Sequence, residues 1–257
     1  MKTSSTEDFA DNKIIEDFEK IIILKVWDDM QNKNYQEALN TLDEFYKSHA
    51  NQDNKDMLLS TCNPWKASIF EEQGLYSQAL ALYQEIFQTN ALEDWMSRIT
   101  QINIARVLLE MERDEEVIEE IEKILAKNPE SPFDLLLALE IYIPALQNLQ
   151  KDLPSQVKSL VEFVSENIGI EIAKESLVSL DDFSQAVEKL SHHNHEANRR
   201  YRELIIELHK AKNSDLDDSS YFEFEKSLLQ EYISEETVGY YRNLATERLD
   251  EVDFVEE

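Results

Sequence analysis

The segment from Ala67 to Phe87 reads ASIFEEQGLYSQALALYQEIF and contains two helical patterns separated by one glycine. Apolar residues recur at helical spacing on both sides of Gly74. They are Ala67, Ile69 and Phe70 before it, and Tyr76, Ala79, Tyr83 and Ile86 after it. Gly74 stands where the first helix would end, because glycine readily adopts the left-handed conformation that caps a helix. The segment therefore predicts a helical hairpin.

The second half of this pattern occurs at three places in the chain. The stretches 34–39, 75–80 and 113–118 each open a helical apolar pattern, and another helical pattern precedes each of them. A fourth, weaker match surrounds Val157. Equivalent positions at Ala38, Ala79, Val117 and Val157 are separated by 41, 38 and 40 residues. Recurrence at such an interval is typical of an array of stacked helical hairpins, which offers a binding surface more often than a catalytic site.

Composition favours the same conclusion. The chain has 257 residues, of which 42% are hydrophobic, so a sizeable core can form. It has only 3 glycines and 5 prolines. Sheets joined by tight turns and phosphate-binding loops need more of these residues, whereas the chain is rich in strong helix formers. The composition therefore indicates an all-α protein.

These hairpins resemble the tetratricopeptide repeat (TPR) family, in which a small residue of the first helix packs against a small residue of the second. The resemblance is carried in the second unit by Ala67, Phe70, Gly74, Tyr76, Ala79, Tyr83 and Ile86, and in the third by Ala105, Leu108, Val117, Ile121, Ile124 and Pro129. The first unit matches mainly through Tyr35, Ala38, Leu42 and Phe45, and a fourth through Ala145, Val157, Val161 and Val164. The spacing exceeds the family period of about 34 residues, so we expect longer helices or connections.

We therefore expect an all-α protein whose main part is an α-solenoid of three to four TPR-like helical hairpins, followed by a C-terminal helical cap or bundle. Residues 1–12 are expected to be a flexible lead-in, 13–170 the repeat array and 171–257 the C-terminal region that caps it. Pro64 is expected to open a helix, and Asn128-Pro129 to end one. Ser179 should begin a helix, because its hydroxyl can accept a free amide proton, and residues 213–220 are the best linker candidate.

Charge restricts the kind of partner. The formal net charge is -29, from 25 Lys and Arg against 54 Asp and Glu. This excess disfavours direct binding to nucleic acid or to anionic membranes, and it favours a basic protein or a Lys- or Arg-rich segment. It is equally compatible with a role in solubility alone. Cys62 is the single cysteine, and we find neither a secretion signal nor a long apolar run, so we expect a soluble cytoplasmic protein.

Candidate chemical groups give little support for catalysis. His192, His193 and His195 stand beside Glu196, and these residue types can bind zinc. We expect them to lie between two helices, where solvated polar residues are common. Cys62 precedes an expected helix start, which can lower a thiol pKa, although a packed and inert cysteine is more common. The sequence predicts no catalytic residue, no metal site and no cofactor.

One basic patch interrupts the acidic sequence, at residues 199–202, which read RRYR. Binding to nucleic acid is disfavoured there by the surrounding carboxylates. Salt bridges within the chain, to the acidic tail at residues 247–257, are a plausible alternative, although exposed pairs contribute little individually.

The resemblance implies that the first helix of each hairpin lines a concave surface for protein segments. The usual exposed positions of the family correspond here to Trp27, Glu71, Glu72, Arg106, Glu110 and Tyr142. Aromatic and arginine residues are common interface anchors, although Trp27 could equally belong to the core. The three glutamates would make this surface suit a basic ligand.

These observations favour a non-enzymatic protein-binding module for a basic partner. One version is an immunity protein, or antitoxin, that covers a basic toxin domain, since electrostatic steering would speed its capture. An alternative is a chaperone or adaptor that binds extended peptides of secreted or assembling proteins. A third possibility, of another class, is a helical-bundle enzyme that uses carboxylates and the three histidines.

Overall fold

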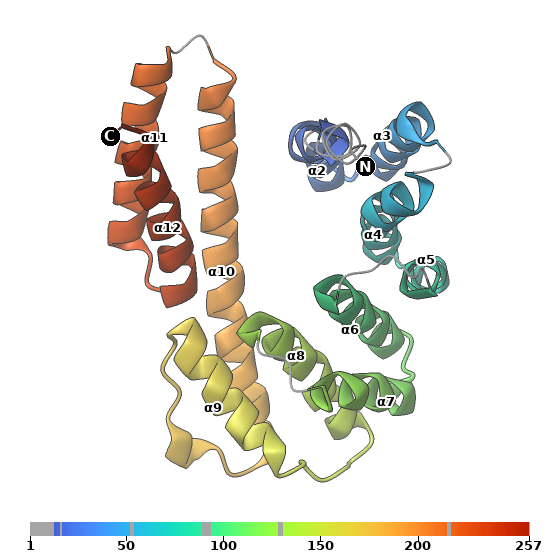
Figure 1. Ribbon diagram of the computed structural model, residues 1–257. Coiled ribbons are helices and arrows are strands. Elements are labelled where there is room, and N and C mark those ends of the chain that lie inside the picture. Colours follow the sequence, from blue (N-terminus) through green and yellow to red (C-terminus); the bar gives the residue numbers. More distant parts are fainter. Residues whose placement is uncertain are drawn as a thin grey trace, which may run out of the picture. The chain divides into compact units, whose positions relative to one another are not determined.

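A computed structural model describes residues 13–15, 17–51, 54–88, 94–127, 131–214 and 217–256. Every regular element within these ranges is a helix, which confirms the expected all-α class (Figure 1). The expected lead-in at residues 1–12 and the expected helix stop at Asn128-Pro129 lie outside the described residues. The chain forms two compact units, one up to Ala126 and one from Lys127 onward.

The first unit is a series of helix pairs. Its elements are η1 (Ile22–Val26), which is a short π-helix, α2 (Trp27–Gln31), α3 (Tyr35–His49), α4 (Lys55–Glu72), α5 (Tyr76–Gln88), α6 (Asp94–Glu110) and α7 (Asp114–Leu125). Within the described residues, η1 and α2 pack with α3, α4 packs with α5, and α6 packs with α7. Further contacts join α3 to α4 and α5 to α6. Successive hairpins therefore stack, as the resemblance to TPR proteins implies.

One turn geometry recurs between the helices of each pair. Lys33, Gly74 and Glu112 in the first unit, and Gln150 in the second, all have positive φ, between 51° and 69°. The next residue in each case donates its backbone N–H to the carbonyl five positions earlier. These bonds are Asn34 to Asp29 (2.7 Å), Leu75 to Phe70 (2.8 Å), Arg113 to Leu108 (3.0 Å) and Lys151 to Leu146 (2.9 Å). This is the Schellman helix ending, so the hairpins share a backbone motif although only one uses glycine.

The small residues that define the repeat pattern lie in the core. Ala38, Ala67, Ala79, Ala105 and Ala145 are completely buried. A side chain of one carbon lets two helix backbones approach closely, while larger apolar residues fill the surrounding space. In the first hairpins, a continuous core holds Phe18, Ile22, Val26, Ala38, Leu42, Phe45, Leu58, Cys62 and Ile69. The predicted apolar positions are therefore the ones that hold each pair together.

Pro64 does not open a helix, contrary to our expectation. Helix α4 already begins at Lys55 and runs through Pro64 to Glu72. Proline removes one backbone N–H and usually bends or breaks a helix. Here, buried side chains on both sides of it, including Cys62 and Ala67, anchor the helix through tertiary packing. Local propensity was a weaker determinant than burial at this position.

The second unit is arranged around one long helix. Its elements are α8 (Pro132–Asn148), α9 (Gln156–Ile168), the 3-10 turn η2 (Lys174–Ser176), α10 (Leu180–Lys212), α11 (Asp218–Glu235) and α12 (Gly239–Glu256). Ser179 caps α10 as predicted, and its hydroxyl accepts from the amide of Asp182. Helix α10 packs against α8 and α9, and also against the hairpin formed by α11 and α12. Figure 1 shows α11 and α12 beside the C-terminal half of α10.

Along the sequence, the boundary between the two compact units follows Ala126, whereas we expected the repeat array to end at residue 170. The α8–α9 hairpin belongs to the second unit, because α10 packs on both of its helices. Our linker candidate, 213–220, extends too far, because residues 218–220 already belong to α11. No helix in the described parts of the chain has both the length and the apolar character needed to cross a bilayer.

Candidate functional site

An ion pair connects the first helices of two successive hairpins. Arg106 of α6 donates two hydrogen bonds to Glu71 of α4, from Nε to Oε2 at 2.9 Å and from Nη2 to Oε1 at 3.0 Å. Such a bidentate contact fixes both distance and orientation. The hydroxyl of Tyr83, from α5, donates to the same carboxylate at 2.7 Å. Glu71 thus holds three helices at one point.

The surroundings of Glu71 make it a structural counter-ion. Its side chain is only 14% exposed, and Tyr83 is 2% exposed. Burial, followed by the charge of Glu71, raises the pKa of Tyr83 well above its ordinary value. Burial alone would lower the pKa of Arg106, but hydrogen bonds and charge from Glu71 raise it overall, so the guanidinium stays charged. The negative charge of Glu71 is therefore compensated within the protein.

Glu110 has a different environment. It lies one helical turn beyond Arg106, on the same side of α6. It is exposed, and the hydroxyl of Tyr76 donates to its Oε2 at 3.2 Å. The charge of Glu110 is the main cause that raises the pKa of Tyr76. Glu72, at the end of α4, is also exposed.

We define the α4–α6 face as Glu71, Glu72, Tyr76, Arg106 and Glu110. Sequence analysis selected four of these residues, and the structure brings Glu71 and Arg106 into direct contact. Tyr76 was assigned only to the repeat core. Its phenol was the available signal, because a tyrosine hydroxyl at the edge of a core commonly finds a polar partner. Which carboxylate it binds depends on how α5 lies against α6.

The other two predicted contact residues lie elsewhere. Trp27, in α2, is half-buried. Tyr142, in α8, is fully buried, so we correct its assignment from a partner contact to the core of the second unit. The register of α8 explains the difference, since Leu139, Tyr142 and Ala145 are all fully buried and occupy one side of the helix. A side chain in that position cannot touch a partner.

We had expected the histidine cluster to lie between two helices, and this was wrong. His192, His193 and His195 are all exposed residues of the continuous helix α10. The Nδ1 atom of His193 lies 2.8 Å from the carbonyl oxygen of Lys189, one turn earlier. Among the described residues, no group of three or more His, Cys, Asp or Glu side chains is arranged to hold a metal ion.

Cys62 lies in the middle of α4, rather than near a helix start. It is completely buried, and burial raises the pKa of its thiol to about 11. A thiol with a raised pKa and no solvent access is a poor nucleophile. The helix-terminus effect that we considered for it therefore does not apply.

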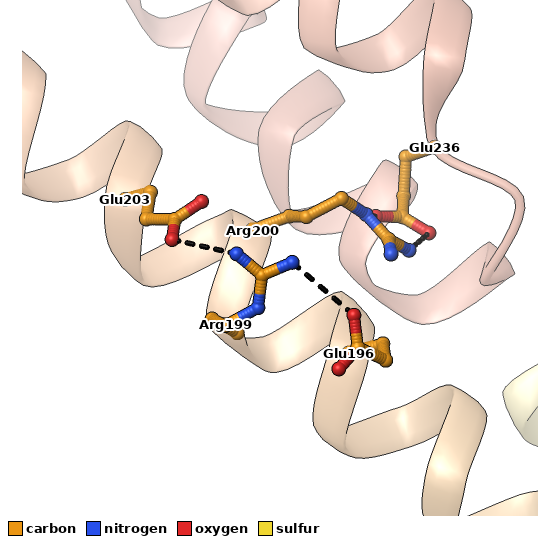
Figure 2. A network of polar contacts seen from close by, with 5 residues as sticks. All are labelled: Glu196, Arg199, Arg200, Glu203 and Glu236. Atoms are coloured by element: carbon orange, nitrogen blue, oxygen red, sulfur yellow. Dashed lines mark hydrogen bonds and ion pairs between the residues drawn. The ribbon is translucent and has the colours of Figure 1, made fainter.

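Arg199 and Arg200 of the basic patch pair with nearby carboxylates (Figure 2). Arg199 pairs with Glu196 at 3.2 Å and Glu203 at 2.8 Å, both on its own helix. Arg200 reaches Glu236, after α11, with bonds of 3.0 and 2.9 Å. The side chain of Glu236 is 0% exposed. Burial favours a higher pKa for this carboxyl, but hydrogen bonds from Arg200 and the Val238 amide lower it overall.

Comparison with known proteins gives one structural match. No family model matches the sequence, and no curated protein matches it. The chain is similar to the crystal structure of a tetratricopeptide repeat protein from Parabacteroides merdae ATCC 43184, with 16% sequence identity and a TM-score of 0.43. The alignment covers 92% of this chain and 99% of that one.

Proposed function

We propose that this chain is a non-enzymatic, cytoplasmic protein-interaction module that binds a basic protein partner through the α4–α6 face and requires no cofactor. The observation that carries the proposal is the uneven charge compensation of this face. Glu71 is paired with Arg106, whereas Glu72 and Glu110 are exposed carboxylates. Among the described residues, neither of the two has an ion-pair partner. A Lys or Arg side chain of a partner would complement them.

The net charge of -29 supports the same kind of partner at longer range. An acidic surface speeds encounter with a basic protein, and salt weakens this steering. We therefore expect association to slow as ionic strength rises. Dissociation should depend less on salt, because it reflects the short-range contacts at the face.

A specific form of this function is that of an immunity protein, which would neutralise a basic toxin domain by covering it. The acidity and modest size of the chain are compatible with this role. The expected signature is tight one-to-one binding of a single cognate toxin and rescue of cells that express it.

The test begins with affinity capture from the native host and identification of the bound protein by mass spectrometry. Binding is then compared between the wild type and the double variant Glu72→Lys/Glu110→Lys. A matched control, Glu188→Lys/Glu207→Lys, makes the same change in net charge at two exposed residues of α10. Glu71 is left intact, because reversing its charge would also break the pair with Arg106.

The proposal expects the Glu72/Glu110 variant to lose most of its affinity and the control to lose much less. Equal losses in the two variants would show that only the total charge matters, and would refute a site at this face. Capture of extended peptides without a folded partner would replace the proposal by an adaptor function. Metal retained through a chelator wash would instead revive the enzymatic alternative.

A further inference from the structure

The α4–α6 face contains two carboxylates with contrasting roles. Glu71 receives two hydrogen bonds from Arg106 and one from Tyr83. Among the described residues, Glu110 accepts one hydrogen bond, from the neutral hydroxyl of Tyr76. A cation that approaches this face would therefore find Glu71 already paired with Arg106, and Glu110 without an ion-pair partner in the described part of the chain.

The position of Glu110 at a helix end adds to this contrast. It is the last residue of α6, where the carbonyl dipoles place partial negative charge. A carboxylate at a helix C-terminus is disfavoured by that field. Glu71 also lies in the last turn of its helix, α4, but Arg106 offsets the repulsion. Glu110 forms no ion pair with a described residue, and neither does Glu72 at the end of α4. Local conflicts of this kind are common at functional positions.

We infer that Tyr76 and Glu110 form the contact point for one Lys or Arg side chain of the partner, whereas Glu71 and Arg106 are a positioning pair that does not touch this cation. The inference rests on the proposed function and specifies which residues perform it. The carboxylate of Glu110 pairs with the cation, and the Tyr76 ring offers a face for its flat or aliphatic part. The Tyr76 hydroxyl orients the carboxylate for this contact.

Arg106 contributes by repulsion as well as by position. Its guanidinium lies one turn before Glu110 on the same side of α6. A partner cation is therefore repelled from Glu71 and directed to the end of the helix. By holding α4 to α6, the same side chain also fixes the position of Glu110 relative to Glu72.

The test uses a fluorescein-labelled peptide that carries one arginine in a neutral background, and the same peptide with citrulline, which keeps the shape of arginine but has no charge. Binding is followed by fluorescence anisotropy at low ionic strength. The variants are Glu110→Gln, Tyr76→Leu and, for the positioning pair, Tyr83→Phe. The Tyr83→Phe variant removes one hydroxyl from Glu71 and is not expected to impair folding.

We expect Glu110→Gln to weaken binding of the arginine peptide by about three- to fivefold, the upper part of the range of an exposed ion pair. The citrulline peptide should bind the wild type as weakly as the arginine peptide binds Glu110→Gln, and combining both changes should cost no more than either alone. Tyr76→Leu should weaken binding in the same direction. Tyr83→Phe should leave binding within about twofold of the wild type.

Failure of the inference can be distinguished from failure of the proposed function. If the wild type does not discriminate between the arginine and citrulline peptides, and no basic partner is captured, the proposed function is wrong. If the wild type discriminates but Glu110→Gln discriminates equally well, the cation is bound elsewhere and the inference is wrong. A loss in Tyr83→Phe as large as in Glu110→Gln would also overturn it, because Glu71 would then be part of the contact.

Discussion

Replacing Arg200 by methionine should loosen the α11–α12 hairpin from α10. Methionine retains an aliphatic stem but lacks the guanidinium with which Arg200 of α10 binds Glu236 (Figure 2). The carboxylate would keep two other donors, the hydroxyl of Tyr232 at 3.1 Å and the amide of Val238 at 2.8 Å. It would remain buried without a counter-charge, which is an unfavourable state for an ionised group.

The expected loss can be bounded from the geometry. Removing one partner of a fully buried ion pair costs about 3–5 kcal/mol, and an exposed pair contributes about 0–1 kcal/mol. Glu236 is at the buried limit, but the Arg200 side chain is 39% exposed, so water can partly replace the guanidinium. We therefore expect a loss of about 2 kcal/mol in the free energy of unfolding of the second unit, between those limits.

The distribution of aromatic residues provides a selective assay. All three tryptophans, Trp27, Trp65 and Trp95, precede Lys127, so their fluorescence follows the first unit. Far-UV circular dichroism reports helix loss in both. In urea titrations, Arg200→Met should move the part of the circular dichroism transition that belongs to the second unit to lower urea concentration. The transition followed by tryptophan fluorescence should stay in place. Hydrogen exchange in α11 and α12 should speed up in parallel.

Arg199→Met is the matched control. Arg199 is adjacent in sequence and also pairs with carboxylates, but it and both partners are exposed on one helix. It should therefore change stability little. If Arg199→Met and Arg200→Met were equally destabilising, or if hydrogen exchange in α11 and α12 did not respond to Arg200→Met, the assigned role of the buried pair would be refuted.

Three further predictions concern the turns, the buried carboxylate and the cysteine. Glu112→Gly should stabilise the first unit by about 0.5–1 kcal/mol and Gly74→Ala should destabilise it by a similar amount, because both positions have positive φ; tryptophan-monitored denaturation would measure both changes. The pKa of Glu236 is lowered in the folded state, so its contribution is complete above its unfolded-state pKa and lost as pH falls through the folded value; the stability difference between wild type and Arg200→Met should shrink in acid, and an unchanged difference would contradict this. Cys62, with its buried thiol and a pKa raised to about 11, should react with a disulfide reagent only after unfolding, and rapid reaction in native buffer would show that the site opens.

Local sequence patterns were enough to predict the helical hairpins. The apolar spacing around Ala38, Ala79 and Ala105 correctly predicted which side of each helix is buried. Ser179 marked the start of α10, because its short hydroxyl side chain stabilises a helix end without help from distant residues. Both signals depend on residues within a few turns of one another, and the sequence alone displays them.

Local reasoning was insufficient where burial overrides propensity. Pro64 was expected to open a helix, but α4 passes through it because the flanking residues are packed in the core. The histidines were expected to lie between two helices, but they are exposed residues within the single helix α10. Lys33, Glu112 and Gln150 adopt a positive φ without being glycine, and no residue type at these positions signalled it. At Pro64, tertiary packing rather than the local preference fixes the backbone.

The candidate site shows the same division. The sequence by itself determined that the protein is acidic and that Glu71, Glu72, Arg106 and Glu110 fall near the ends of the first helices of two hairpins. Only the tertiary structure decided that Arg106 pairs with Glu71, whereas Glu110 accepts from the neutral hydroxyl of Tyr76. The reason is that the environment of a charge depends on the groups within a few ångströms of it. Here those groups belong to residues about 35 positions apart in the sequence, which come together when one hairpin stacks on the next.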